Sequence, residues 1–318
     1  MTRIGGHVHE MRRNVVVSRV LLVANLALLG ATGALFARLM DAGLVGTLKA
    51  AGVFLAGGAL AIVISLARLP RVTGAYPATG YLPEVRGLLD GVSLAAGILP
   101  PALYLIQDPY PNAFAFGVHP NRARVAVTTG LLDIMTPREV EAVLAHEVAH
   151  IANRDTQVMT IAYGTFAFLN FISMFWAFIA AAAATGAITT GDDDEGVAIV
   201  AGVIGLFAFF MLLLTLPVTA GSWLLTMAIS RDREALADAT AVRYLSSPTQ
   251  LRHAFEKMAA YPVRPYTRQI AAMCVHGAGK HRSAGSTHPP MGWRINTLRR
   301  LEGLPPDEAA VAYLEAAP

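Results

Sequence analysis

Long apolar runs alternate with polar stretches along this chain. Four of the runs approach or exceed the roughly 20 residues that a helix needs to cross a bilayer, and they cover about 15–37, 50–67, 159–188 and 197–228. The first is longer than the apolar part of a signal peptide, and the second follows closely, so a cleaved signal is disfavoured. We therefore expect about four transmembrane helices. The alternative for the last two is a pair of alanine-rich buried helices.

The polar region between the second and third apolar runs predicts a small folded domain. Residues 83–96 carry apolar side chains at helical spacing. Short strand patterns follow at 102–106, 112–117 and 124–130. The fold class expected is α+β, mainly α, with a small antiparallel sheet. The edge of that sheet, at Asn112, Ala113 and Phe114, could take an extended peptide as an added strand, or the strands could serve only to cover the next helix.

That next helix contains the motif H-E-x-x-H. Thr136 as N-cap, Pro137 at the first helical position and Glu139 at the third predict its start. No glycine or proline interrupts the run as far as Thr156, so His146 and His150 are expected to lie on one continuous helix, a turn apart. Residues four apart share a helix face.

On that helix His146 and His150 can face one metal ion, and Glu147 beside them can act as a general base. The alternative is a pair of hydrogen-bonded histidines in a buried helix, since the five-residue pattern by itself is weak.

A catalytic zinc usually has a third protein ligand and one open position. Glu234 follows the fourth apolar run, and Asp238 lies one helical turn further on. Asp238 could then accept a hydrogen bond from the far nitrogen of a ligand histidine. Spacing alone leaves a second interpretation open, in which both carboxylates lie on a solvated face and pair with Arg231 or Arg233.

Composition supports a membrane protein. The chain is 54% hydrophobic and 15% charged, with a mean hydropathy of +0.49, against about 25% charged residues in soluble domains. A net charge of +3 without an arginine-rich arm predicts no nucleic-acid partner. The single cysteine, Cys274, excludes an intramolecular disulfide and a cysteine-rich zinc site; a small buried or loop thiol is expected.

The distribution of lysine and arginine predicts the orientation. The N-terminal tail holds three arginines, whereas the segment 192–195 between the last two apolar runs is entirely acidic. We expect a multi-pass protein of the plasma (inner) membrane, in contact with the lipid bilayer, with both termini and the His146 helix in the cytoplasm.

Several motifs occur together and in one order: Pro111–Ala115, Val127–Leu132, His146–Ile151 with Asp155, Arg233–Asp238, and Ser286–Pro290 with Arg294. In this combination the chain resembles the HtpX-like membrane zinc metalloproteases, relatives of the type I CAAX prenyl proteases. The resemblance implies a zincin-type (gluzincin) domain and one Zn²⁺ per subunit held by His146, His150 and Glu234. It also implies Glu147 as the base, with Asp155 and Asp238 behind the ligands.

The resemblance also implies an organisation and a substrate class. The expected parts are a tail with two transmembrane helices (1–70), a first catalytic part (71–158), two further spans (159–228) and a second catalytic part (229–318). Expected substrates are membrane proteins or unfolded polypeptides, cleaved in quality control and the stress response. The alternatives are a prenyl-protein peptidase and a non-catalytic zinc-binding scaffold, although a structural site would not need Glu147.

The oxyanion that forms during peptide hydrolysis needs a hydrogen-bond donor. His288 or Arg294, at or just after the segment Ser286–Pro290, is the expected donor. His288 could instead be only a turn residue before Pro289 and Pro290.

Overall fold

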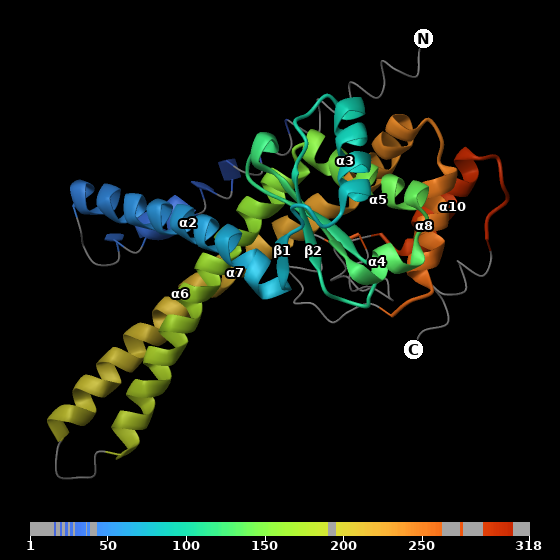
Figure 1. Cartoon of the computed structure of the whole chain (residues 1–318). Coiled ribbons are helices and arrows are strands. Elements are labelled where there is room, and N and C mark those ends of the chain that lie inside the picture. Colours follow the sequence, from blue (N-terminus) through green and yellow to red (C-terminus); the bar gives the residue numbers. More distant parts are fainter. Residues whose placement is uncertain are drawn as a thin grey trace. The chain divides into compact units, whose positions relative to one another are not determined.

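The computed structural model describes residues 43–189, 195–262, 274–275 and 289–307, together with short pieces between residues 16 and 38. Contacts divide the chain into two compact units. The first contains residues 1–21, 66–161 and 226–318, and the second contains residues 22–65 and 162–225. The helices α2 (Leu44–Thr73), α6 (Asp155–Thr189) and α7 (Glu195–Leu245) contribute residues to both units (Figure 1).

The first unit contains a four-stranded sheet with the strand order β1-β2-β4-β3. Its strands are β1 (Ala75–Pro77), β2 (Ala102–Ile106), β3 (Ala113–Phe116) and β4 (Arg124–Thr128). The three predicted strands are confirmed, whereas β1 was missed. The prediction of an antiparallel sheet is wrong, because β2 and β4 pair in parallel while the other two pairs are antiparallel. Alternation along a strand predicts its faces but not its partner, and β4 enters between β2 and β3.

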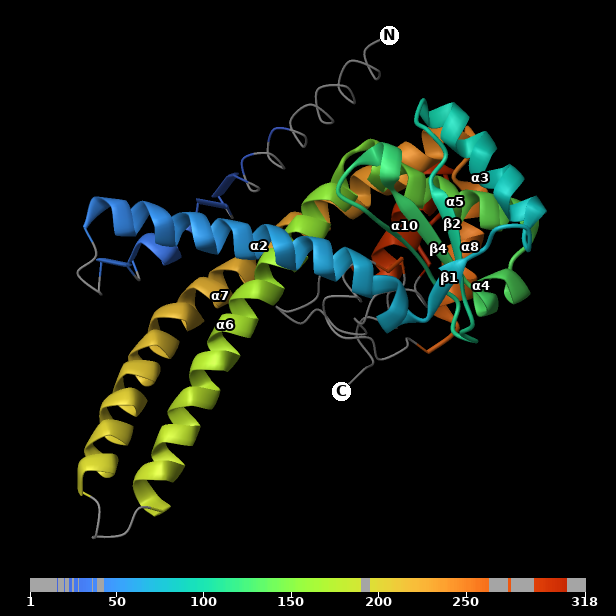
Figure 2. The same ribbon diagram turned by 60° about the vertical axis from the view of Figure 1, so that its left-hand side comes forward.

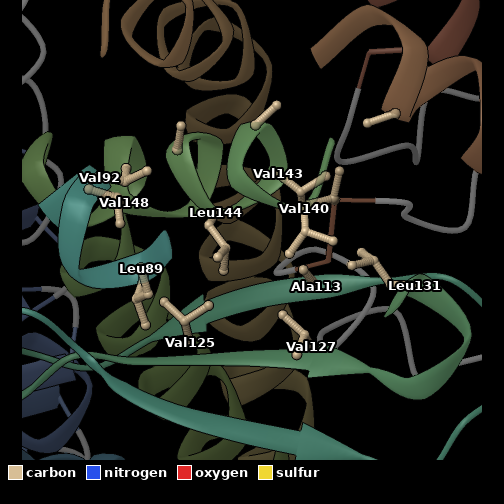
Figure 3. Close-up of a cluster of buried hydrophobic side chains, with 14 of the residues drawn as sticks. Leu89, Val92, Ala113, Val125, Val127, Leu131, Val140, Val143, Leu144 and Val148 are labelled. Carbon is tan, nitrogen blue, oxygen red and sulfur yellow. The ribbon is translucent and has the colours of Figure 1, made fainter. Parts of the chain in front are cut away.

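The two faces of the sheet have different cores. Leu103, Leu105, Val125 and Val127 point toward α3 (Pro83–Ala96) and α5 (Pro137–Ala152). Figure 3 shows Val125 and Val127 on the strands facing Leu89 of α3 and Leu144 of α5, and Figure 2 shows these two helices packed on the sheet. The alternate residues form a second cluster on the other face: Ile106, Phe114, Phe116 and Ala126, with Leu69 and Cys274.

Helix α5 begins where the sequence predicts. The Thr136 hydroxyl accepts a hydrogen bond from the Glu139 backbone N–H, and the Glu139 carboxylate accepts one from the Thr136 N–H, which completes a capping box. Glu139 also pairs with Lys257 of α8 (Thr249–Ala259), with 2.6 Å between Nζ and Oε2. The start of α5 is therefore held by its own sequence and by a second helix.

A break in the backbone ends α5 shortly after His150. The helix stops at Ala152, and Arg154 adopts a left-handed conformation with φ of 65° before α6 begins at Asp155. The two histidines lie on one continuous helix, as expected, but that helix does not run on to Thr156. Without a break, Asp155 would lie roughly 140° around the axis from His150, because a helix has about 3.6 residues per turn. The break brings the Asp155 carboxylate to the His150 ring, with 3.0 Å between Oδ2 and Nδ1.

The remaining helices of the first unit complete the core. A short 3₁₀ turn (Pro120–Arg122) precedes β4, and α4 (Thr129–Ile134) follows it. Helix α10 (Met291–Leu301) packs beside α8, and Arg252 Nε of α8 donates to Glu302 Oε2 at the end of α10 over 2.8 Å. Phe255 and Leu298, both fully buried, fill the space between these helices and α5.

The second unit is formed mainly by long apolar helices. Within the described residues, two are long and apolar enough to cross a membrane, Leu44–Thr73 and Asp155–Ala183, and a shorter apolar stretch covers Ile199–Leu213. The structure therefore describes two such helices rather than the four expected. The predicted span 15–37 is described only in part, in short helical pieces, and the span 197–228 lies within α7.

Helices α6 and α7 run side by side in both views (Figures 1 and 2). Ser173 Oγ of α6 donates to Thr215 Oγ1 of α7 over 3.1 Å and lies 3.2 Å from Thr219 Oγ1. The Thr215 and Thr219 hydroxyls also donate to carbonyls of their own helix, four residues earlier. Near them, several large apolar side chains of both helices are exposed, among them Phe171, Met174, Leu213 and Leu216.

Candidate metal centre

Helix α5 places two imidazoles at one point. His146 and His150 are one turn apart, and their Nε2 atoms lie 3.1 Å from each other. His146 is fully buried and the His150 side chain is 14% exposed. The apolar residues on the same helix pack on the sheet, so the histidines lie within the fold with their Nε2 atoms directed at a common position.

Helix α7 adds a carboxylate to the pair. Glu234 Oε2 lies 3.6 Å from His146 Nε2, and Glu234 Oε1 lies 3.5 Å from His150 Nε2. One donor atom from each of the three residues falls within 4.8 Å of the others. Two histidines and one glutamate form a donor set of catalytic zinc sites. Glu234 is 4% exposed, so the interpretation of a solvated face is wrong for this residue.

A carboxylate lies behind each histidine. Asp238 Oδ1 is 3.0 Å from His146 Nδ1, and Asp155 Oδ2 is 3.0 Å from His150 Nδ1. Each contact leaves Nε2 directed at the common position, because the Nδ1–H donates to the carboxylate. Both carboxylates are buried.

Each of these carboxylates is in turn held by a buried arginine. Arg233 Nη1 donates to Asp155 Oδ1 over 2.8 Å. Arg294 donates two hydrogen bonds to Asp238, from Nε to Oδ2 over 2.9 Å and from Nη2 to Oδ1 over 2.6 Å. The site therefore contains two series of contacts, each running from an arginine through a carboxylate to a histidine. The sequence motifs include Arg233 and Arg294 but do not indicate which carboxylate each one binds.

Glu147 lies next to His146 in the same buried region and is 1% exposed. Its Oε2 atom has no hydrogen-bond partner among the described residues. Burial raises the pKa of Glu147, with a further contribution from the charge of Glu234, while His146, His150 and Arg294 act in the opposite direction. A buried carboxylate oxygen without a hydrogen-bond partner is costly for a fold, so Glu147, beside three possible metal ligands, is a candidate for a chemical role.

The protonation of His146 depends on the same groups. Burial and the charge of Arg294 lower its pKa, but hydrogen bonds to Asp238 and Glu234 outweigh them and raise the pKa to about 9. Four buried carboxylates (Glu147, Asp155, Glu234, Asp238) face two buried arginines (Arg233, Arg294) here. A metal ion would bind the neutral form of both histidines. With all four carboxylates ionised, these side chains would then carry two net negative charges, which one divalent cation would balance.

The strand expected to take substrate, β3, is an edge strand of the sheet. Asn112 donates from its backbone N–H to Thr128 Oγ1 over 2.8 Å, which fixes the start of β3. Phe114 pairs with Cys274 through an antiparallel bridge, and the Val275 N–H donates to the Ala113 carbonyl over 2.9 Å. Sequence reasoning anticipated a small buried or loop thiol at Cys274, which is buried, but no local pattern indicated its pairing with β3.

The two expected oxyanion donors have different outcomes. His288 lies outside the described residues. Arg294 is described, is 1% exposed, and directs its guanidinium at Asp238 and Glu234. Its planar group also stacks on Phe255, with 4.1 Å between Cζ and the ring centroid, and the same ring lies edge-on to His146. Sequence analysis missed Phe255 because nothing in its helical context distinguishes it from a core residue.

Two histidines from one helix, a glutamate from a second helix and a buried carboxylate beside them define the centre of a metal-dependent peptidase. The chain belongs to peptidase family M48, whose model matches residues 84–302. It is 32% identical over 291 residues to a "Protease HtpX homolog" of Limosilactobacillus reuteri, covering 87% of this chain and 92% of that protein. These findings confirm that it is a metallopeptidase with HtpX-like relatives.

A second relative and one solved structure are also similar to this chain. A "Protease HtpX homolog" of Caldanaerobacter subterraneus subsp. tengcongensis is 36% identical over 241 residues, covering 72% of this chain and 75% of that protein. The crystal structure of S. mikatae Ste24p aligns with a TM-score of 0.47 and 18% identity, covering 93% of this chain and 66% of that one.

Proposed function

We propose that this metallopeptidase is an integral membrane zinc endopeptidase that uses Glu147 as its general base. The observation that carries the proposal is the meeting of His146, His150 and Glu234 beside the unpartnered Oε2 of Glu147. A non-catalytic scaffold would have no use for that buried carboxylate.

The residues fit zinc. Two imidazole nitrogens and one carboxylate oxygen converge, which is a donor set of catalytic zinc sites. With neutral histidines and ionised carboxylates, the buried side chains would balance the charge of one such ion. When bound, zinc supplies a Lewis acid that polarises the scissile carbonyl and lowers the pKa of a water molecule. His146, His150 and Glu234 would hold it, while Asp238 and Asp155 keep each histidine in the tautomer that offers Nε2.

Glu147 would perform the proton transfers. Its carboxylate accepts the proton of the attacking water and delivers it to the leaving amine. The absence of a hydrogen-bond partner at Oε2 among the described residues leaves this oxygen available for that proton. Burial excludes competing water and strengthens the electrostatic interactions of the site. His288 is the proposed donor of a hydrogen bond to the oxyanion.

Peptide binding would use the outer edge of the sheet. Asn112 precedes β3, and Ala113 and Phe114 begin it. An extended substrate would pair with the backbone of this edge strand in place of Cys274 and Val275, which bind it in this structure. Substrates of this form are unfolded segments rather than folded domains. We infer that unfolded polypeptides and loops of membrane proteins are cleaved, in keeping with quality control.

The apolar helices support a membrane location. Large side chains point outward along them, including Leu44 at 74%, Phe178 at 70% and Leu206 at 71% exposure. Only 6% of the most apolar 18-residue stretch of α2 is buried, whereas the core helix of a soluble protein is mostly buried. Exposed apolar surface of this extent is stable in lipid and not in water. With the basic tail and acidic 192–195 segment, this supports a multi-pass inner-membrane protein with its site in the cytoplasm.

The proposal is tested with Glu147→Gln in the full chain in detergent. This variant keeps the ligands and is expected to bind zinc at the wild-type stoichiometry, while hydrolysis of an unfolded membrane-protein substrate falls by on the order of 10²–10⁴. Metal analysis of both proteins is the control. Wild-type rates from the zinc-loaded variant would exclude Glu147 as the base. Cleavage of a prenylated peptide, with no cleavage of the unfolded substrate, would instead indicate a prenyl-protein peptidase.

A further inference from the structure

The Arg294 guanidinium connects three parts of the site. Two of its nitrogens bind Asp238, and Nη1 lies 3.0 Å from Glu234 Oε2. The group is buried, and Phe255 covers one of its faces. A guanidinium has five N–H donors in a fixed plane. Here they are directed at Glu234, a candidate metal ligand, and at Asp238, the carboxylate behind the candidate ligand His146.

The same Nη1 atom also donates to the Val275 carbonyl over 3.2 Å. The Val275 N–H in turn donates to the Ala113 carbonyl, and the neighbouring Cys274 forms the bridge to Phe114. Arg294 therefore reaches the ligand set on one side and the residues paired with the β3 edge on the other.

We propose that Arg294 is a positioning residue that couples the metal ligands to the Cys274–Val275 pair on the edge of β3. This inference rests on the proposed function, because it concerns the same zinc site and the same substrate edge. A peptide that competes for the Ala113 carbonyl would release Val275 and so change the contacts that Arg294 makes with Glu234 and Asp238. Substrate docking at the edge is thereby sensed at the metal ligands.

Arginine is required for this coupling. Its planar fork binds the Asp238 carboxylate through two parallel bonds while the third nitrogen reaches Glu234 and a backbone carbonyl. Lysine supplies one compact ammonium group and cannot meet these acceptors together. The Arg294 Nη2 atom also lies 3.2 Å from His146 Nε2. Because its contacts are with the candidate ligands and the groups behind them, Arg294 acts in this proposal through those residues rather than on the oxyanion.

The chain provides its own reporter and its own control. Cys274 is the single cysteine and is 1% exposed, so the rate of its alkylation by N-ethylmaleimide measures release of the pair. Arg233 holds Asp155 behind His150, as Arg294 holds Asp238 behind His146. Arg233→Lys is therefore the matched control for Arg294→Lys.

The experiment measures zinc affinity by chelator competition, Cys274 alkylation and the melting temperature of the full chain in detergent. Both variants are expected to lose roughly 10–100-fold in zinc affinity. Only Arg294→Lys is expected to accelerate alkylation of Cys274, at a melting temperature comparable to that of Arg233→Lys. Equal alkylation rates in the two variants would overturn the coupling.

A second variant keeps the test decisive if Arg294→Lys fails to fold. Val275→Pro removes the N–H that binds Ala113 and touches no ligand, yet coupling is reciprocal and predicts weaker zinc binding. Unchanged zinc affinity in Val275→Pro would refute the inference. Failure of the proposed function would look different, because the wild type itself would then lack stoichiometric zinc and Glu147-dependent hydrolysis.

Discussion

His150 Nδ1 and Asp155 Oδ2 lie 3.0 Å apart, although the two residues belong to different helices. The contact depends on the left-handed backbone of Arg154, which ends α5 and redirects the chain. Non-glycine residues in this conformation cost of order 1–3 kcal/mol and often occur at functional sites. The break is therefore a feature of the site, because it brings Asp155 to the second histidine.

Substitution of Arg154 tests this relationship. The Arg154 side chain is exposed, so its backbone conformation is the relevant property. Arg154→Gly is expected to keep zinc affinity, since glycine adopts positive φ freely. Arg154→Val is expected to weaken zinc binding by displacing Asp155, because β-branched residues disfavour this conformation. Calorimetric zinc titration of the two variants gives the comparison, and equal affinities would show that the break is dispensable.

The third ligand and its neighbour should respond differently to truncation. Glu234→Ala removes a donor and is expected to abolish stoichiometric zinc. Asp238→Ala leaves the donors in place and should reduce affinity by roughly 10–100-fold. Zinc content after dialysis against a graded series of chelators separates the two effects. Wild-type affinity in Glu234→Ala would place the third ligand elsewhere.

The pairing of Glu139 with Lys257 predicts a dependence of stability on pH. Partial burial acts to raise the pKa of Glu139, but its bonds to Lys257 and Thr136 outweigh burial and lower that pKa. A lowered pKa stabilises the fold above the unfolded value of about 4.3, and the contribution is lost as pH falls through the folded value.

The melting temperature of the wild type should therefore exceed that of Glu139→Gln at about pH 7, and the difference should shrink as the pH falls toward about 3. Lys257→Met, which removes the partner cation, should reproduce this behaviour. A constant difference over the whole range would contradict the assigned ion pair.

Membrane orientation can be tested with single cysteines in a Cys274→Ser background. A cysteine in place of Asp193 is expected to react with an impermeant maleimide added to intact cells. A cysteine in place of His276 is expected to react only after the membrane is permeabilised. The reason is the contrast between the acidic 192–195 segment and the basic tail. The reverse labelling would place the metal centre outside.

The sequence by itself determined the local features. The capping box at Thr136, the helical spacing of His146 and His150, and the amphipathic helix Pro83–Ala96 all appear as predicted. Each depends on interactions between residues no more than about one helical turn apart, which a linear pattern records. For the same reason the motif of Glu147 beside two histidines indicated the chemistry before the fold was known.

Only the tertiary structure decided how distant segments meet. Three such contacts have no local signature in the sequence. They are the parallel pairing of β2 with β4, the ion pair of Arg233 with Asp155 across 78 residues, and the contact of Arg294 with Asp238 across 56 residues. From its spacing in the sequence, Glu234 could lie on a solvated face or act as a metal ligand. In the structure it is buried beside the two histidines. Packing settles such cases because charges removed from water must find partners, and those partners lie wherever the fold brings them.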